Sequence, residues 1–286
     1  MRRRLGLSIV ELLTVVTMLV VLAALLTPVL VSARNAVSDV QCVTNFRQVS
    51  VAVALYQGSY EDRFVLAKYQ AGDEFDPMRD KTWVQLTLPY VGNLVNYKCP
   101  RDQGHDLRSQ GKFDGDLVPG DPWHHLYLSS MRVNTGYNFV YLAPLVKDGE
   151  NTFAFPRSTT VIYDPAMTLL IADSVFATDS KKRPTGGGSY LVVPPCRWAL
   201  DRKDSFELGG YENHQIYTPA HRWERPQREP TQMGGLWPWH DGKLTVAFTD
   251  GHVKMLPIAR MYEGCEVLPG WGGTLGDSGR YLWDLR

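Results

Sequence analysis

The residues best suited to chemistry in this sequence are two aspartates and two histidines in its second half: Asp173, His240, Asp250 and His252. Carboxylates and imidazoles are ligands for divalent cations, and two histidines favour a transition metal over calcium, which prefers oxygen ligands. Each residue also has a structural interpretation. Asp250-Gly251 is typical of a hairpin turn, and His240 beside Trp239 fits a packed histidine. A metal site and purely structural roles both stay open.

A hydrolytic site is a weaker hypothesis. Ser174 follows Asp173 directly and could join a histidine in a Ser/His/Asp set, but the sequence has no G-x-S-x-G motif. Walker A and dinucleotide-binding motifs are absent as well. We therefore expect that the protein is not an enzyme and has no cofactor, unless a divalent cation binds at the residues above.

Composition narrows the class of protein. The 286 residues carry 30 basic and 30 acidic side chains, and no basic stripe accompanies the aromatic residues. We expect no nucleic-acid partner. The four cysteines are far apart and form no C-x-x-C motif, which gives little support to a zinc finger or a thioredoxin-like site. An even count allows three disulfide pairings, and free buried thiols remain an alternative.

An apolar segment near the N-terminus indicates a membrane. Leu12 to Ala33 is a run of 22 residues without a formal charge, long enough to cross a bilayer. The arginines at positions 2–4 should stay cytoplasmic, so the rest of the chain is exported. Glu11 lies at the start of the run, although a carboxylate costs roughly 2.5 to 3.5 kcal/mol at the bilayer centre. An ordinary signal anchor and a cleaved secretory signal are the alternatives; the latter usually has a shorter core.

The helix should continue beyond the apolar segment. Apolar residues recur at spacings of three and four, which is typical of one buried helix face: Val43, Phe46, Val49, Val53, Tyr56 and Tyr60. We predict one helix from Leu7 to Gln57, about 75 Å long, which accommodates Pro28 and stops at Gly58. Residues 7–33 would be its transmembrane part and 34–60 its amphipathic extension.

Residues 61–286 should form an exported, β-rich domain. Residues 168–173 are typical of a buried central strand, and residues 244–256 of a hairpin with a two-residue turn at Asp250-Gly251. The segment from about 176 to 232 is rich in Gly and Pro, and we interpret it as a surface insertion.

The N-terminus resembles the cleavage and methylation signal of type IV prepilins and type II secretion pseudopilins. The resemblance rests on Gly6-Leu7, Glu11 and the apolar helix behind them. It implies that residues 1–6 are a leader removed by prepilin peptidase, that Leu7 is N-methylated, and that Glu11 neutralises the new α-amino group of a neighbouring subunit. Leu7 departs from the Phe that is more usual there.

Later motifs resemble a bacterial group of prepilin-type proteins with an H-x9-DG C-terminal domain. His240 precedes Asp250-Gly251 by the required spacing, and further matches are Cys42-Val-Thr-Asn45, Tyr97-Lys-Cys99-Pro100, Gly136-Tyr-Asn138 and Ile171-Ala-Asp173. The group implies no enzymatic activity. With chain position, the resemblance favours two disulfides, Cys42 with Cys99 and Cys196 with Cys265.

The resemblance also implies fold, partners and location. The fold would be α+β and pilin-like, with the long N-terminal helix packed on an antiparallel sheet with elaborated loops. The partners would be prepilin peptidase, other pilin or pseudopilin subunits and the bacterial inner membrane. The chain would be a single-pass subunit of a type IV pilus or pseudopilus, with its C-terminal domain outside the cytoplasm.

A second hypothesis is an anchored envelope protein that binds glycan or peptide. The insertion would then present an exposed aromatic cleft, built from Tyr190, Trp198, Tyr211, Tyr217 and Trp223.

Overall fold

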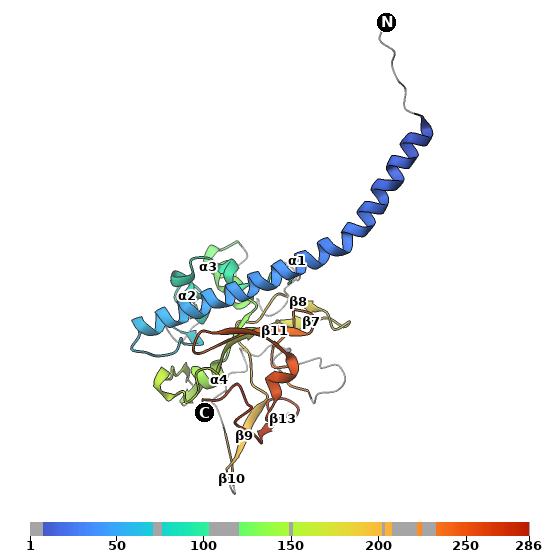
Figure 1. The fold of residues 1–286 in the computed structure, drawn as a ribbon. Coiled ribbons are helices and arrows are strands. Elements are labelled where there is room, and N and C mark those ends of the chain that lie inside the picture. Colours follow the sequence, from blue (N-terminus) through green and yellow to red (C-terminus); the bar gives the residue numbers. More distant parts are fainter. Residues whose placement is uncertain are drawn as a thin grey trace. The chain divides into compact units, whose positions relative to one another are not determined.

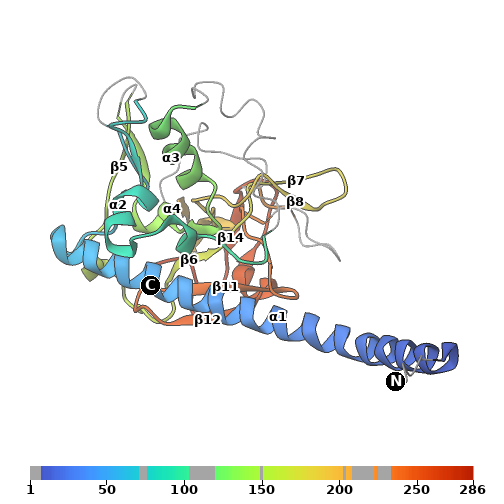
Figure 2. The ribbon, with the colours of Figure 1, turned by 90° about the horizontal axis from the view of Figure 1, so that it is seen from above.

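The computed structural model describes residues 8–70, 76–102, 120–148, 151–201, 204–207, 222–224 and 233–285. Figures 1 and 2 show their elements. The chain divides into two compact units, residues 1–41 and 42–286. The fold is α+β, as predicted: a long N-terminal helix and sheets that are mainly antiparallel.

Helix α1 (Ile9–Ser59) has 51 residues and agrees with the predicted helix to within two residues at each end. Pro28 lies inside it, as expected. In the first unit, the apolar side chains of the helix are exposed. Among the described residues, α1 is the one helix long and apolar enough to cross a membrane, and none of its most apolar 18-residue window is buried.

The part of α1 that belongs to the second unit packs into the core of that unit. Phe46, Val49, Val53 and Tyr56 are buried, which confirms most of the predicted stripe. Tyr60 follows the end of the helix, is exposed and stacks on Tyr56 with ring centroids 4.2 Å apart. Apolar periodicity therefore identified the face of the helix that the domain covers.

The first main sheet has the strand order β12-β11-β6-β3, with every pair antiparallel. Its strands are β3 (Thr135–Tyr137), β6 (Leu169–Asp173), β11 (Lys243–Phe248) and β12 (Val253–Pro257). All residues of β6 are buried, which confirms the predicted central strand. Figures 1 and 2 show β11 beside the part of α1 in this unit.

The predicted hairpin is present, but its turn has a different length. Phe248 N–H donates to His252 O, and Gly251 N–H donates to Phe248 O, so three residues, 249–251, form the loop. Gly251 has a positive φ of 87°. A type I turn followed by a left-handed residue is a common three-residue hairpin loop, and glycine fits that last position without a steric penalty.

The second main sheet has the order β10-β9-β14-β13. Its strands are β9 (Cys196–Asp201), β10 (Asp204–Glu207), β13 (Cys265–Glu266) and β14 (Gly273–Leu275), and β9 pairs with β14 in parallel. A disulfide joins Cys196 in β9 to Cys265 in β13. That pairing was predicted.

The prediction that 176–232 is a surface insertion is wrong for its middle part. Tyr190, Leu191, Val192 and Val193 are buried in the core, and β9 lies between two strands of the second sheet. Four consecutive apolar residues gain more from burial than from exposure, despite the Gly and Pro residues around them.

The other elements connect and cover these sheets. The helices are α2 (Trp83–Val91), η1 (Leu94–Tyr97), α3 (Pro122–Met131), α4 (Phe139–Leu142), η4 (Thr159–Val161) and η7 (Ile258–Tyr262). Three two-stranded sheets pair β1 (Lys68–Tyr69) with β2 (Lys81–Thr82), β4 (Leu145–Asp148) with β5 (Asn151–Ala154), and β7 (Ala177–Thr178) with β8 (Pro184–Thr185).

Candidate metal centre

Four buried side chains with metal-binding atoms meet inside the second unit. They are Cys42, Cys99, Asp173 and His240, and their ligand atoms all lie within 4.8 Å of one another. Each side chain belongs to a different part of the chain: α1, the segment after η1, the last position of β6, and the segment before β11. Each residue is at most 2% exposed.

The polar atoms of this cluster contact one another at 3.4 to 3.7 Å. Cys42 Sγ is 3.7 Å from Asp173 Oδ1. Cys99 Sγ is 3.6 Å from His240 Nε2, and the same nitrogen is 3.4 Å from Asp173 Oδ2. Two sulfurs, one imidazole nitrogen and one carboxylate thus face a common point.

Asn134 positions the segment that carries Cys99. Its side-chain oxygen accepts the N–H of Cys99 at 2.9 Å, and its side-chain nitrogen donates to Asp102 Oδ2 at 2.8 Å. Its own N–H donates to Tyr97 O. Asn134 is fully buried and just precedes β3. One amide therefore fixes the Cys99 segment against the first sheet.

Thr245 of β11 supports the other side of the cluster. Its N–H donates to Asp173 Oδ2 at 2.6 Å, and its hydroxyl donates to Cys42 Sγ at 3.4 Å. His240 is held by two backbone hydrogen bonds with Lys243, each 3.0 Å long. The sheet therefore orients Asp173 and His240, while Thr245 links the helix to the sheet.

The two thiols differ electrostatically. A hydrogen bond to Cys99 and burial both raise the pKa of Cys42, and the nearby Asp173 carboxylate adds to this effect. The same hydrogen bond, with a further one to His240, lowers the pKa of Cys99 despite its burial. Cys99 is therefore the thiol that ionises more readily, beside the imidazole that can stabilise its charge.

The structure brings together two of the four residues predicted as metal ligands. Asp173 and His240 lie in the cluster, whereas Asp250 and His252 lie at the turn of the hairpin and contact each other at 2.6 Å. The His252 ring also stacks on Phe248, with centroids 4.2 Å apart. Asp250 and His252 therefore do not belong to the buried cluster, contrary to the prediction.

For the two cysteines of the cluster, the resemblance predicts a disulfide and not metal binding. The predicted Cys42–Cys99 disulfide is absent from the structure, in which both residues are free thiols. Their proximity, although not the bond, agrees with the prediction. One sequence signal could have placed Cys42: it lies four residues before Phe46, on the same buried face of α1.

Ser174 does not have the arrangement of a catalytic nucleophile. It is fully buried, and its hydroxyl donates to Ser189 O at 2.7 Å. The hydroxyl is thus directed to a backbone carbonyl.

The predicted processing residues Gly6 and Leu7 lie outside the described residues, but Glu11 is described. Its carboxylate accepts the N–H of Ser8 at 2.8 Å, and its own N–H donates to Ser8 Oγ at 3.2 Å. This reciprocal pair is a capping box at the start of α1. The S-x-x-E pattern of residues 8–11 is the sequence signal of such a cap, and the prediction of a helix start at Leu7 did not take it into account.

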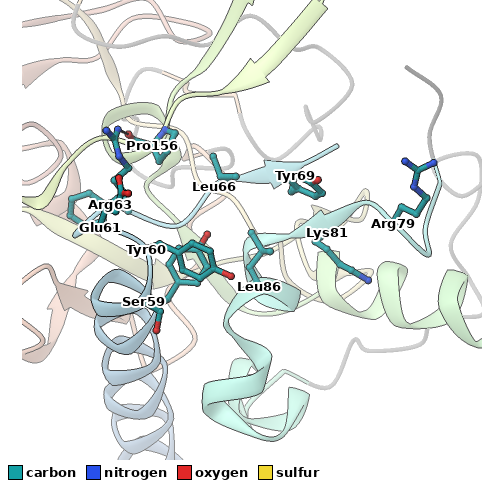
Figure 3. Close-up of a pocket in the computed structure, with 12 residues that line it drawn as sticks. Ser59, Tyr60, Glu61, Arg63, Leu66, Tyr69, Arg79, Lys81, Leu86 and Pro156 are labelled. Atoms are coloured by element: carbon teal, nitrogen blue, oxygen red, sulfur yellow. Dashed lines mark hydrogen bonds between the residues drawn. The ribbon is translucent and has the colours of Figure 1, made fainter. Parts of the chain in front are cut away.

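A separate pocket of about 590 Å³ lies beside the C-terminal end of α1. Tyr60 and Leu86 approach each other in it, and Tyr69, Arg79 and Lys81 extend it along β1 and β2 (Figure 3). Tyr60 and Tyr69 are 53% and 45% exposed, so aromatic faces are available to a ligand there.

The predicted aromatic cleft in the insertion does not form from those of its residues that the structure describes. Tyr190 and Trp223 are buried, and the indole N–H of Trp223 donates to Val193 O at 2.8 Å. Tyr211 and Tyr217 lie outside the described residues.

Comparisons with known proteins place the chain in no group. No protein-family model, no curated protein and no solved structure matches it.

Proposed function

We propose that the chain is a membrane-anchored, pilin-like structural subunit. The observation that carries the proposal is helix α1: it begins with an exposed apolar segment of membrane-spanning length and continues into the buried core of a β-rich unit. A soluble protein would have to leave this large apolar surface in water, at a cost of about 25 cal/mol per Å². A bilayer or the helices of neighbouring subunits would cover it.

In this function, the apolar segment has two successive environments. Before assembly it anchors the chain in the inner membrane, with Arg2–Arg4 on the cytoplasmic side. After prepilin peptidase has cut between Gly6 and Leu7, the same segment packs against other subunits. Glu11 then pairs with the α-amino group of a neighbour, because an unpaired charge in a packed bundle costs several kcal/mol.

Processing tests the proposal directly. The full chain would be expressed with an active prepilin peptidase, and its intact mass compared with that of Gly6→Ala. We expect the wild-type chain to lose residues 1–6 and gain one methyl group, and the variant to remain uncut. Gly58→Ala is a matched control, because nothing lies within 4 Å of a Cβ added at Gly58. A wild-type chain that starts at Met1, or near Ala33, would contradict the proposal.

A second candidate function is that of an anchored binding protein, and the pocket beside Tyr60 favours it. Exposed Tyr60 and Tyr69 offer the aromatic surface on which sugar rings pack, while Arg79 and Lys81 supply positive charge. The full chain in detergent should then bind an acidic oligosaccharide. Tyr60→Ala should weaken binding at least tenfold, and exposed Tyr163, which is not among the residues lining the pocket, provides the control variant Tyr163→Ala.

A further inference from the structure

We propose that Cys42, Cys99, Asp173 and His240 form a structural Zn²⁺ site. The site would join the part of α1 in the second unit to the first sheet. This inference goes beyond the proposed function, because neither membrane anchoring nor assembly requires a metal. It rests on the spacing of the four ligand atoms, the chemistry of the donors, and the groups that hold them.

Three contacts in the cluster are close to the ligand-to-ligand distances of a tetrahedral zinc site; two of them are made by different oxygens of the Asp173 carboxylate. Zinc binds sulfur at about 2.3 Å, and nitrogen and carboxylate oxygen at about 2.0 to 2.2 Å. Tetrahedral angles then place sulfur and oxygen about 3.6 Å apart, sulfur and nitrogen about 3.6 Å, and nitrogen and oxygen about 3.4 Å. The distances found are 3.7 Å for Cys42 Sγ to Asp173 Oδ1, 3.6 Å for Cys99 Sγ to His240 Nε2, and 3.4 Å for that nitrogen to Asp173 Oδ2.

The types of donor atom in the cluster favour zinc over calcium and magnesium. Two sulfurs and an imidazole suit zinc, whereas calcium and magnesium require oxygen ligands. Four protein ligands fill a tetrahedral zinc, as in structural sites; a catalytic site keeps one position open for water. All four residues are nearly inaccessible to solvent, which agrees with a closed site.

Residues around the cluster hydrogen-bond to the proposed ligands, as outer residues do in metal sites. With zinc bound, the two cysteines would be thiolates. Together with the carboxylate they would carry one negative charge more than Zn²⁺ neutralises. Thr245 meets this excess with two donors, its hydroxyl to Cys42 Sγ and its N–H to Asp173 Oδ2. Cys99 is oriented by the hydrogen bond from its N–H to Asn134. Such outer hydrogen bonds orient metal ligands and stabilise their charge.

Metal analysis of the full chain tests the proposal. The chain would be purified in detergent from zinc-supplemented cells, without chelators, and its zinc content measured by elemental mass spectrometry. We expect about one zinc per chain in the wild type and less than about 0.1 in His240→Ala. His252→Ala is the matched control, since it removes a histidine that lies outside the cluster, and it should keep its zinc.

A second measurement uses the wild type alone, so that the test does not depend on a variant that fails to fold. Replacing zinc by Co²⁺ should give intense visible bands of tetrahedral coordination and a thiolate-to-cobalt charge-transfer band. Chelation should abolish both bands and make two thiols reactive. Three outcomes would overturn the proposal: a wild-type zinc content below about 0.1, an octahedral cobalt spectrum, or a Cys42–Cys99 disulfide in non-reducing peptide maps. None of these outcomes bears on processing at Gly6, so the proposed function is tested independently.

Discussion

Removing the disulfide between Cys196 and Cys265 should cost the second unit a large part of its stability. The double variant Cys196→Ala/Cys265→Ala is the perturbation. The bond joins β9 to β13 within one sheet, and its partners are 69 residues apart in the sequence. The loop that it closes contains β10, β11 and β12, so it restricts a large fraction of the unfolded chain.

The magnitude follows from the length of this loop. In the chain-entropy model, a closed loop of this length reduces the entropy of the unfolded chain by an amount equivalent to about 4.4 kcal/mol at 25 °C. The pairing of β9 with β14 and of β13 with β14 remains, so we expect the variant to fold with a lower melting temperature. For a unit of this size the decrease should be about 9 to 18 °C.

The assay is thermal unfolding of the full chain in detergent, followed by tryptophan fluorescence. Trp271 and Trp283 are buried in the same unit and report on its packing. The control is Cys265→Ala alone, which opens the same bond and should give most of the same decrease. A shift of less than about 3 °C in the double variant would refute the reasoning, because the loop would then restrict the unfolded chain very little.

Three further predictions concern single residues. Glu11→Gln and Glu11→Ala should both reduce incorporation into sheared filaments without reducing membrane abundance; normal incorporation of the Gln variant, which can preserve the capping box, would show that the charge is dispensable. Gly251→Ala should lower the free energy of unfolding by about 1 kcal/mol, because the residue has a positive φ, whereas Gly58→Ala in the exposed end of α1 should be neutral or stabilising, as urea unfolding can show. Asn134→Ala leaves the buried N–H of Cys99 without its acceptor and should cost about 1 to 3 kcal/mol in the same assay; a change below about 0.5 kcal/mol would contradict this role.

Local patterns were sufficient to predict the elements that are defined by local periodicity. Helix α1 follows from a charge-free run and a stripe of apolar residues, and β6 and the hairpin follow from short apolar segments beside turn residues. The one error in the hairpin, the length of its turn, arose because Asp-Gly occurs both in two-residue turns and at the end of three-residue loops.

Composition misled the prediction where a buried apolar segment, residues 190–193, lies among turn residues. The segment Gly186–Gly188 indicated an exposed loop, yet a Cβ added at Gly188 would lie 2.0 Å from Val133 O. That glycine is therefore required by close packing of two backbones. The apolar run 190–193 that follows it was the better signal.

The candidate site could be predicted only in part, because its four ligands come from distant segments. Asp173 and His240 were identified by residue type, but nothing local connects either of them to a cysteine. Their grouping depends on how the β6–β11 register and the buried face of α1 meet, and that is a property of the tertiary fold.

The wide separation of these ligands in the sequence also determines when the cluster can exist. Cys42 and Asp173 are 131 residues apart, Cys99 and His240 are 141 apart, and Cys42 and Thr245 are 203 apart. Contacts between such distant residues form late, because long loops must close before the contacts repay the entropy. In the proposed function the chain is exported from its N-terminus onward, so both cysteines would reach the far side of the membrane long before their partners. Until His240 and Thr245 had emerged, the thiols would remain without their native environment and open to oxidation or mispairing. If the chain is exported as proposed, the order of its residues makes complete translocation a precondition for protecting Cys42 and Cys99.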